Sequence, residues 1–334
     1  MLEKPAIPDG QIIACLRSAY GLSVAGLDFL ALGADANTAV YRAVTVDKTP
    51  YFVKLRSGAF DESSVSVPNY LSDRGLRPII APRATRTGRL WAEVAAYRLI
   101  LYPFVESRDA YEVKLSARQW RELGAALRRV HETVLPPATA SGIRREAFSP
   151  RWREQLRQII RLAETGAYDD PAAAEMATYM MLKREEISEL IRWADAHAAT
   201  LQARPRPFVL CHSDLHAGNA VIDSNDRLYI VDWDQPIFAP KERDLMYPGG
   251  AQGFIGRSPQ EEERLFYEGY GPVEVDAAAV AYYRFERIVE DLALYGEDLL
   301  LTDAGGADRA RALRYVKSNF EAGGTIEMAY RANG

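Results

Sequence analysis

The chain has 334 residues, of which 48% are hydrophobic and 26% charged, and its net charge at pH 7 is −5. This length allows one large two-lobed domain or two ordinary domains with a substantial core. The acidic balance without a basic block argues against nucleic acid as the main partner and is compatible with a cationic small molecule. Because no apolar run is long enough to span a membrane and no signal peptide begins the chain, we expect a cytoplasmic protein without a membrane partner.

The first third of the sequence is rich in short apolar runs of the kind found in strands. A helix is expected over Asp9–Tyr20, closed by Gly21. The β-like runs, which indicate an antiparallel meander, are Gly26–Leu32, Ala39–Val46, Tyr51–Leu55, Gly88–Val94 and Tyr97–Val105. A further helix is expected over Asp61–Ser72.

Lys54 stands inside the otherwise apolar run Tyr51–Leu55. Burying an ammonium group without a partner is costly, so a lysine at this position indicates a specific anionic partner. The alternative is an edge-strand lysine whose charged end reaches solvent.

From Ser116 onward the pattern is largely helical. The expected helices cover Ser116–His131, Pro150–Thr165, Pro171–Thr200 as one or two helices, Lys241–Met246, Pro259–Tyr267, Asp276–Leu300 and about Ala307–Phe320. The change from β-rich to α-rich sequence predicts an N-terminal lobe of residues 1–104 and a C-terminal lobe of residues 105–334.

The most informative stretch lies between two strand-like runs, Phe208–Cys211 and Leu228–Val231. The loop after the first run carries Asp214 and Asn219, and Asp232 follows the second run directly. Phosphoryl transfer from Mg-ATP needs one carboxylate to orient the acceptor hydroxyl, and an amide oxygen with a second carboxylate to hold Mg²⁺. We therefore predict Asp214 as the catalytic residue and Asn219 and Asp232 as metal ligands. A simple turn is the alternative, because Asp and Asn also bond their own backbone.

The pattern H-x-D-x-x-x-x-N, followed by an apolar run ending in Asp, resembles the catalytic and metal-binding segments of the protein-kinase-like superfamily. The chain is identified as a member of its aminoglycoside phosphotransferase family, and most resembles spectinomycin phosphotransferases. The resemblance extends from about Leu27 to Phe320 and rests on CHSDLHAGN (211–219), YIVDWDQPIFAPKERDLM (229–246), FYEGYG (266–271) and YYRFERIVEDLALYG (282–296).

This resemblance implies an α+β, two-lobed protein-kinase-like fold, with a small antiparallel β-sheet and one or two helices in the N-lobe and a larger, mainly helical C-lobe. It implies ATP and Mg²⁺ as cofactors. Lys54 would bind the ATP phosphates and pair with a helix carboxylate, Glu62 or else Asp61. The loop at residues 33–38, with a single glycine, would cover the phosphates. Adenine would lie against Tyr102, Phe104 and Val105. Structural rather than catalytic roles are expected for His212 and His216.

The acceptor implied by the resemblance is an aminocyclitol antibiotic, which carries two positive charges. The carboxylates expected to bind it are Asp234, Asp244, Glu286, Glu290 and Asp291. An alternative for the helical segment is a solvated ion-pair face, in which Arg287 pairs with Asp291. Two other functions stay open: a metabolic kinase for choline, homoserine or a sugar amine, and a catalytically silent relative, which the complete set of Lys54, Asp214, Asn219 and Asp232 disfavours.

Overall fold

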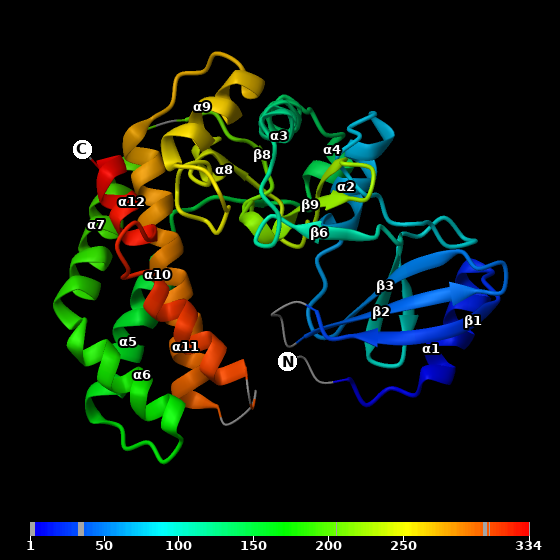
Figure 1. Ribbon diagram of the computed structural model, residues 1–334, viewed down its shortest axis with the longest axis horizontal. Helices are drawn as coiled ribbons and strands as arrows, with labels where there is room; N and C mark the ends of the chain where they lie inside the picture. Colours follow the sequence, from blue (N-terminus) through cyan, green and yellow to red (C-terminus); the bar gives the residue numbers. More distant parts are fainter. Residues whose placement is uncertain (1–3, 33–36, 205, 303–305, 307, 334) are drawn as a thin grey trace.

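The structure is a computed structural model that describes residues 4–32, 37–204, 206–302, 306 and 308–333. A five-stranded antiparallel sheet lies beside a larger, mainly helical part (Figure 1). In sheet order its strands are β1 (Val24–Leu30), β2 (Thr38–Thr45), β3 (Pro50–Arg56), β5 (Tyr97–Pro103) and β4 (Ala92–Val94). The α+β architecture expected from the sequence is confirmed, whereas most of the expected phosphate-covering loop lies outside the described residues.

One face of this sheet is covered by the first helix. The helix α1 (Asp9–Cys15) continues as a π-helical turn, Leu16–Tyr20, and ends at Gly21, whose φ of 75° suits glycine. Ile12 and Leu16 pack in one buried cluster with Tyr41 and Leu99 of the sheet. Since successive side chains of a strand point to opposite faces, Lys54 points away from this helix, toward the helical part.

The helix α2 (Ser63–Asp73) packs against both the sheet and the helical part. Its Val65 belongs to a buried cluster with Trp91 and Ile100 beside the sheet. Its Val67 and Leu71, by contrast, are buried in the large cluster formed mainly by residues beyond 110. Residues of α2 therefore pack on both sides of the expected lobe boundary. The position of that boundary near residue 104 stays a prediction.

The helical part is arranged around one long central helix, α10 (Ala277–Leu301). The other helices are α3 (Ala117–His131), α4 (Pro137–Ala140), α5 (Arg151–Thr165), α6 (Pro171–Leu182), α7 (Arg184–Gln202), α8 (Glu242–Leu245), α9 (Pro259–Tyr270), α11 (Asp308–Ser318) and α12 (Thr325–Asn333). Ser116 forms a capping box at the start of α3, as its position before an amphipathic run predicts. The sequence did not predict α12. None of the helices in the described ranges is long and apolar enough to cross a membrane.

Two small sheets hold the ends of the segment 212–219, here called the Asp214 loop. One joins β6 (Ser107–Asp109), β9 (Ala220–Asp223) and β10 (Leu228–Ile230), and the other joins β7 (Arg144–Arg145), β8 (Val209–Cys211) and β11 (Ile237–Ala239). The short segment Ile237–Ala239, β11, is the central strand of the second sheet. The segment is a strand because β8 and β7, distant in sequence, supply its hydrogen-bond partners on both sides.

Two helices that position the site pack unusually closely. A Cβ atom on Gly124 of α3 would lie 2.1 Å from the carbonyl oxygen of Phe266, and one on Gly269 of α9 would lie 1.9 Å from that of Arg121. Only glycine permits such a close approach of two helix backbones. It places His131 and Tyr270, the last residues of α3 and α9, in contact beneath the Asp214 loop.

Candidate active site

The Asp214 loop is held from inside the protein by Asp244 of α8. The Asp244 side chain is fully buried, and its carboxylate accepts hydrogen bonds from the backbone N–H groups of His212 at 2.8 Å and Ser213 at 2.7 Å. It also bonds Nε2 of His131 at 3.0 Å. Burial would raise the pKa of Asp244, but His131 and the other donors hold it below its usual value. The sequence-based assignment of Asp244 to substrate binding is therefore wrong, because its oxygens are occupied by the loop.

The two histidines of the loop make backbone hydrogen bonds. Nδ1 of His212 accepts a hydrogen bond from the N–H of Asp214 at 3.2 Å, and its Nε2 bonds the carbonyl oxygen of Val231 at 2.9 Å. Nδ1 of His216 accepts one from the N–H of Gly218 at 3.0 Å. These bonds fit the structural roles expected for both rings: His212 links the loop to the segment after β10, and His216 bonds within the loop.

Asp214 is half-buried and surrounded by donors. Its Oδ1 accepts a hydrogen bond from Nη1 of Arg287 at 2.6 Å, and its Oδ2 accepts one from Nδ2 of Asn219 at 3.3 Å. Burial alone would raise the pKa of Asp214, but Arg287 and His216 hold it well below its usual range. Asp214 is therefore ionised, and the donors around it fix the orientation of its carboxylate.

Lys54 of β3 lies opposite the end of β10. Its Nζ is 2.9 Å from Oδ1 of Asp232 and 2.8 Å from Oδ1 of Asp234, and Asp234 also pairs with Arg56. Burial would lower the pKa of Lys54, but the two carboxylates raise it above its ordinary value. This buried ammonium therefore stays charged, and it has anionic partners as its place in an apolar strand predicts.

The expected partner of Lys54 was wrong for this structure. Glu62 is exposed where it precedes α2, and Asp61 accepts a hydrogen bond from the N–H of Ser63 at the start of that helix. Among the described residues, the ion pairs of Lys54 are with Asp232 and Asp234. The segment after β10 reaches Lys54 directly, whereas much of α2 packs against the helical part.

The residues expected to meet adenine divide between the two faces of the sheet. Tyr102 faces the same side as Lys54 and packs edge-to-face with Phe52. Phe104 lies under the guanidinium group of Arg42, 5.3 Å from the ring centroid. The side chain of Val105 lines a hollow of about 690 Å³ together with Leu101, whose side chain points to the opposite face. Tyr102 and Phe104 therefore remain the better placed of the three side chains.

Asn219 and Asp232 supply oxygen atoms suited to a hard cation. The side-chain amide of Asn219 donates through Nδ2 to the backbone oxygen of Asp214 at 2.7 Å, so its amide oxygen points elsewhere. Asp232 follows β10 with a φ of 62°, an uncommon backbone conformation for a residue other than glycine, and 45% of its side chain is exposed. Carboxylate and amide oxygens are ligands that Mg²⁺ accepts, so the residues present fit this metal.

Two of the acidic residues predicted to bind the acceptor lie on α10 beside Asp214. Oδ1 of Asp291 accepts a hydrogen bond from Nε of Arg287 at 3.0 Å, which confirms the ion pair expected from their helical spacing. Glu290 has no hydrogen bond or ion pair among the residues that the structure describes. Burial raises the pKa of both carboxyl groups.

Glu286 and Asp234 do not lie with this pair. Glu286 is 6% exposed, and its Oε2 lies 3.1 Å from Nε of Arg153 inside the helical part. Burial raises the pKa of Glu286 to about 7. It therefore belongs to the core, and its assignment to the acceptor site was wrong. Asp234 lies with Lys54 and Arg56, on the side predicted for the nucleotide.

Several residues of the site escaped the sequence reasoning. Arg56 pairs with Asp234, the hydroxyl group of Tyr247 lies 3.4 Å from Oδ1 of Asp214, and the hydroxyl group of Tyr111 lies 3.1 Å from Nδ1 of His216. The stacked rings of Tyr295 and Tyr315 lie further along α10 and on α11. A tyrosine in an apolar segment is usually interpreted as a core residue, so nothing in the sequence marked these tyrosines as part of the site. The helical spacing of Arg287 and Asp291 was the signal that the sequence did contain.

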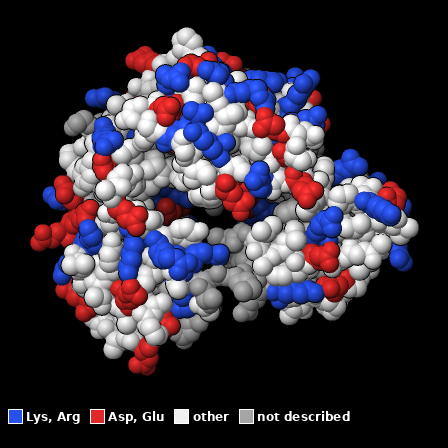
Figure 2. All heavy atoms as spheres, in the orientation of Figure 1, with Lys and Arg blue, Asp and Glu red and all other residues white. Residues whose placement is uncertain are grey.

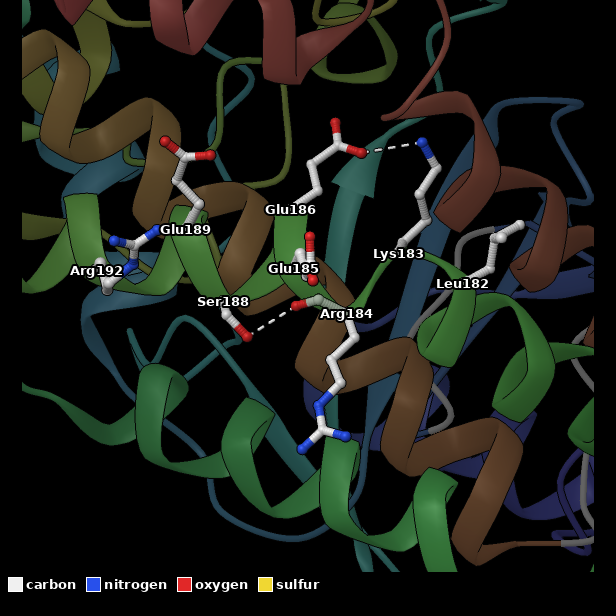
Figure 3. A pocket seen from close by; sticks show the side chains of 8 residues that line it. All are labelled: Leu182, Lys183, Arg184, Glu185, Glu186, Ser188, Glu189 and Arg192. Carbon is white, nitrogen blue, oxygen red and sulfur yellow. Dashed lines mark hydrogen bonds and ion pairs between the residues drawn. The ribbon is translucent and has the colours of Figure 1, made fainter.

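The space-filling view shows a hollow between the sheet and the helical part, with positive and negative side chains interspersed on this face (Figure 2). Another hollow, of about 890 Å³, lies at the start of α7 (Figure 3). Residues of a single stretch, 182–192, line it, and two of them, Lys183 and Glu186, pair with each other at 2.9 Å. Its lining therefore has no convergent set of groups like that around Asp214.

Comparisons with known proteins agree with this geometry. Residues 28–240 match the phosphotransferase enzyme family. Protein StrN of Streptomyces griseus is 27% identical over 253 residues, which cover 73% of this chain and 75% of that protein. Spectinomycin phosphotransferase APH(9)-Ia, solved in complex with ADP and spectinomycin, is 35% identical. That match has a TM-score of 0.91 and covers 98% of this chain and 99% of the other.

The amicoumacin kinase hAmiN, solved in complex with AMP-PNP, Ca²⁺ and Ami, shares the fold at 18% identity. Its TM-score is 0.61, and the match covers 94% of this chain and 93% of the other. The protein-kinase-like fold and the resemblance to spectinomycin phosphotransferases, both expected from the sequence, are thereby confirmed. The chain belongs to the phosphotransferase enzyme family.

Proposed function

We propose that the protein is an ATP-dependent phosphotransferase that moves the γ-phosphoryl group to a hydroxyl group of a cationic aminocyclitol antibiotic, with spectinomycin as the first acceptor to test. The observation that carries the proposal is the proximity of Lys54, Asp214, Asn219 and Asp232 in one site. Glu290 and Asp291 of α10 lie beside it. The 35% identity to APH(9)-Ia over 98% of the chain supports it.

We propose a role for each of these residues, supported by its position. Lys54 would bind the nucleotide phosphates, and Asn219 with Asp232 would hold Mg²⁺, which neutralises charge on the phosphates when bound. Asp214 would orient the acceptor hydroxyl and receive its proton late in a loose transition state. The hydroxyl oxygen forms the new bond to the γ-phosphorus as the bond to the bridging oxygen breaks and ADP leaves.

The acceptor side supports a cationic substrate. Glu290 and Asp291 lie in the electrostatic neighbourhood of Asp214, and burial raises the pKa of both. A desolvated carboxylate is stabilised by a bound ammonium group, and it penalises a neutral analogue that leaves it unpaired. Within the described part of the chain Glu290 makes no hydrogen bond or ion pair, although Arg287 and Arg243 lie in its electrostatic neighbourhood. We therefore propose it as the first residue to bind an acceptor ammonium group.

The test is an assay that couples ADP release to a readable signal, with spectinomycin, several 2-deoxystreptamine aminoglycosides, choline and homoserine as acceptors. Mass spectrometry of the products should find one added phosphoryl group on spectinomycin. The Asp214→Asn variant is the control for contaminating kinases. Phosphorylation of choline or homoserine in preference to every aminocyclitol would replace the antibiotic reading with the metabolic one. A host carrying the gene should gain resistance to the antibiotic that is phosphorylated.

A further inference from the structure

The ion pair between Asp214 and Arg287 joins the proposed catalytic carboxylate to the acceptor side of the site. Nη1 of Arg287 lies 2.6 Å from Oδ1 of Asp214, while its Nε lies 3.0 Å from Oδ1 of Asp291. The exposed fractions of the three side chains are 25%, 35% and 27%, so solvent reaches all of them. One guanidinium group therefore bridges two carboxylates at the place where an acceptor must enter.

The carboxylate of Asp214 has four polar neighbours, and Arg287 makes the shortest contact with it. A carboxylate offers roughly four acceptor sites. Oδ1 is approached by Arg287 and by the hydroxyl group of Tyr247 at 3.4 Å, and Oδ2 by Nδ2 of Asn219 at 3.3 Å and Nε2 of His216 at 3.6 Å. An acceptor hydroxyl that donates to Oδ1 therefore competes with the short bond from Arg287.

Three of the four neighbours are held in place by shorter bonds to the backbone. The hydroxyl group of Tyr247 donates to the carbonyl oxygen of Ser213 at 2.7 Å, and Nδ2 of Asn219 donates to that of Asp214 at 2.7 Å. His216 accepts from the N–H of Gly218 at 3.0 Å. Arg287 differs from them because its second partner is another carboxylate, Asp291, one turn further along α10.

We propose that Arg287 is the specificity-determining residue of the acceptor site: it occupies Asp214 until a cationic acceptor binds, and then shifts onto Asp291 so that Asp214 meets the acceptor hydroxyl. The inference rests on the proposed phosphoryl transfer. Leaving Asp214 costs Arg287 little, because its charge stays paired with Asp291. The acceptor ammonium group replaces the lost positive charge beside Asp214 by pairing with Glu290.

The charges at the site fit this exchange. Asp214, Glu290 and Asp291 carry three negative charges when ionised, and Arg287 carries one positive charge. Arg243, also in the electrostatic neighbourhood of Glu290, is paired with Glu146 at 3.3 Å, so a net charge of about −2 remains for a dicationic acceptor. Water brings no charge with which to displace the guanidinium group. Arg287 therefore protects ATP from hydrolysis while the acceptor is absent.

Two variants should move activity in opposite directions. Arg287→Met keeps an unbranched apolar side chain and removes the guanidinium group. ATP hydrolysis without acceptor should therefore rise by about tenfold or more, up to the roughly 10²–10⁴-fold that a general base typically contributes. The share of ATP that ends as phosphorylated acceptor should fall. Asp291→Asn removes the resting place of Arg287, so kcat with acceptor should fall while acceptor-free hydrolysis stays low. Arg287→Lys should restore part of the protection.

The matched control is Arg264→Met on α9, which breaks another i,i+4 pair between an arginine and a carboxylate, with Glu268, on an exposed surface. Melting curves and titration with ADP establish that each variant folds and binds nucleotide, and Arg287→Gln replaces Arg287→Met if the latter does not fold. Unchanged acceptor-free hydrolysis, or an equal loss of hydrolysis and transfer, would overturn the inference. Failure of wild-type protein to phosphorylate any aminocyclitol would instead remove the proposed acceptor, while acceptor-free hydrolysis still reports on Arg287.

Discussion

Lys54 and Asp232 form an ion pair of 2.9 Å although 178 positions separate them in the chain. One residue comes from the sheet and the other from the segment that closes the Asp214 loop. Asp234 reaches the same ammonium group from two residues further on, at 2.8 Å. The pair fixes the proposed nucleotide-binding face of the sheet against the proposed metal ligand, so its loss should affect both activity and stability.

Replacing Lys54 by Met should therefore have two separable effects. Turnover should fall and KM for ATP should rise, because a point charge on the phosphates is lost. The melting temperature should also fall, since Asp232 and Asp234 then face each other without their shared cation. Adding Asp234→Asn to Lys54→Met should recover the melting temperature but not the turnover. Equal recovery of both would show that Lys54 acts on stability alone.

Asp232→Ala tests the metal site. Asp234 remains as a partner of Lys54, so the fold should survive while Mg²⁺-dependent turnover is lost. The measurement is steady-state kinetics over a range of Mg²⁺ concentrations, with circular dichroism for the fold. Normal turnover of this variant at saturating Mg-ATP would contradict the assignment of Asp232 as a ligand.

Asp244→Asn separates support of the loop from binding of substrate. The buried carboxylate accepts two backbone N–H groups and faces His131, so the amide should cost roughly 3 kcal/mol in the free energy of unfolding. We expect a lower kcat, because the Asp214 loop loses its anchor, and little change in the relative KM values for different acceptors. A selective rise in KM for cationic acceptors would return Asp244 to the acceptor site.

The buried Glu286 predicts how stability depends on pH. Its pKa is about 7 in the folded protein and about 4.5 when unfolded, so the unfolded state ionises first as pH rises. The stabilising contribution is complete below about pH 4.5 and is lost as pH approaches and passes 7, with a limit of about 3.5 kcal/mol at about 1.4 kcal/mol per pKa unit. Urea unfolding at pH 5 and pH 8 should show that Glu286→Gln loses less stability between these values than wild type. An equal loss in both proteins would exclude Glu286 as the titrating group.

Local patterns predicted the parts of the site that depend on neighbours in sequence. An ammonium group in an apolar strand marked Lys54, the H-x-D-x-x-x-x-N spacing marked Asp214 and Asn219, and helical spacing paired Arg287 with Asp291. Whether these residues perform the predicted chemistry awaits the experiments above, because position alone does not test it.

The errors come from contacts between distant segments. The composition of residues 282–296 shows acidic groups but not the direction in which each points. Helix packing turns Glu286 toward Arg153 and places Glu290 in the electrostatic neighbourhood of Arg287 and Arg243. Asp244 was predicted to bind substrate because no residue near it in the sequence indicates that the backbone N–H groups of His212 and Ser213 need a hydrogen-bond acceptor. The contact of Arg287 with Asp214, 73 positions away, depends on how α10 packs beside the loop.

Glu290→Gln tests the acceptor side directly. The amide keeps the shape of the side chain and removes its charge, so a cationic acceptor loses an ion pair while a nucleotide bound at Lys54 is unaffected. Charge-assisted bonds contribute roughly 1.5–3 kcal/mol, so KM for spectinomycin should rise by about tenfold to a hundredfold with KM for ATP unchanged. Glu286→Gln is the matched control, because the same substitution one helical turn away lies in the core. A rise in KM for ATP, or equal KM values for spectinomycin in the two variants, would remove Glu290 from the acceptor site.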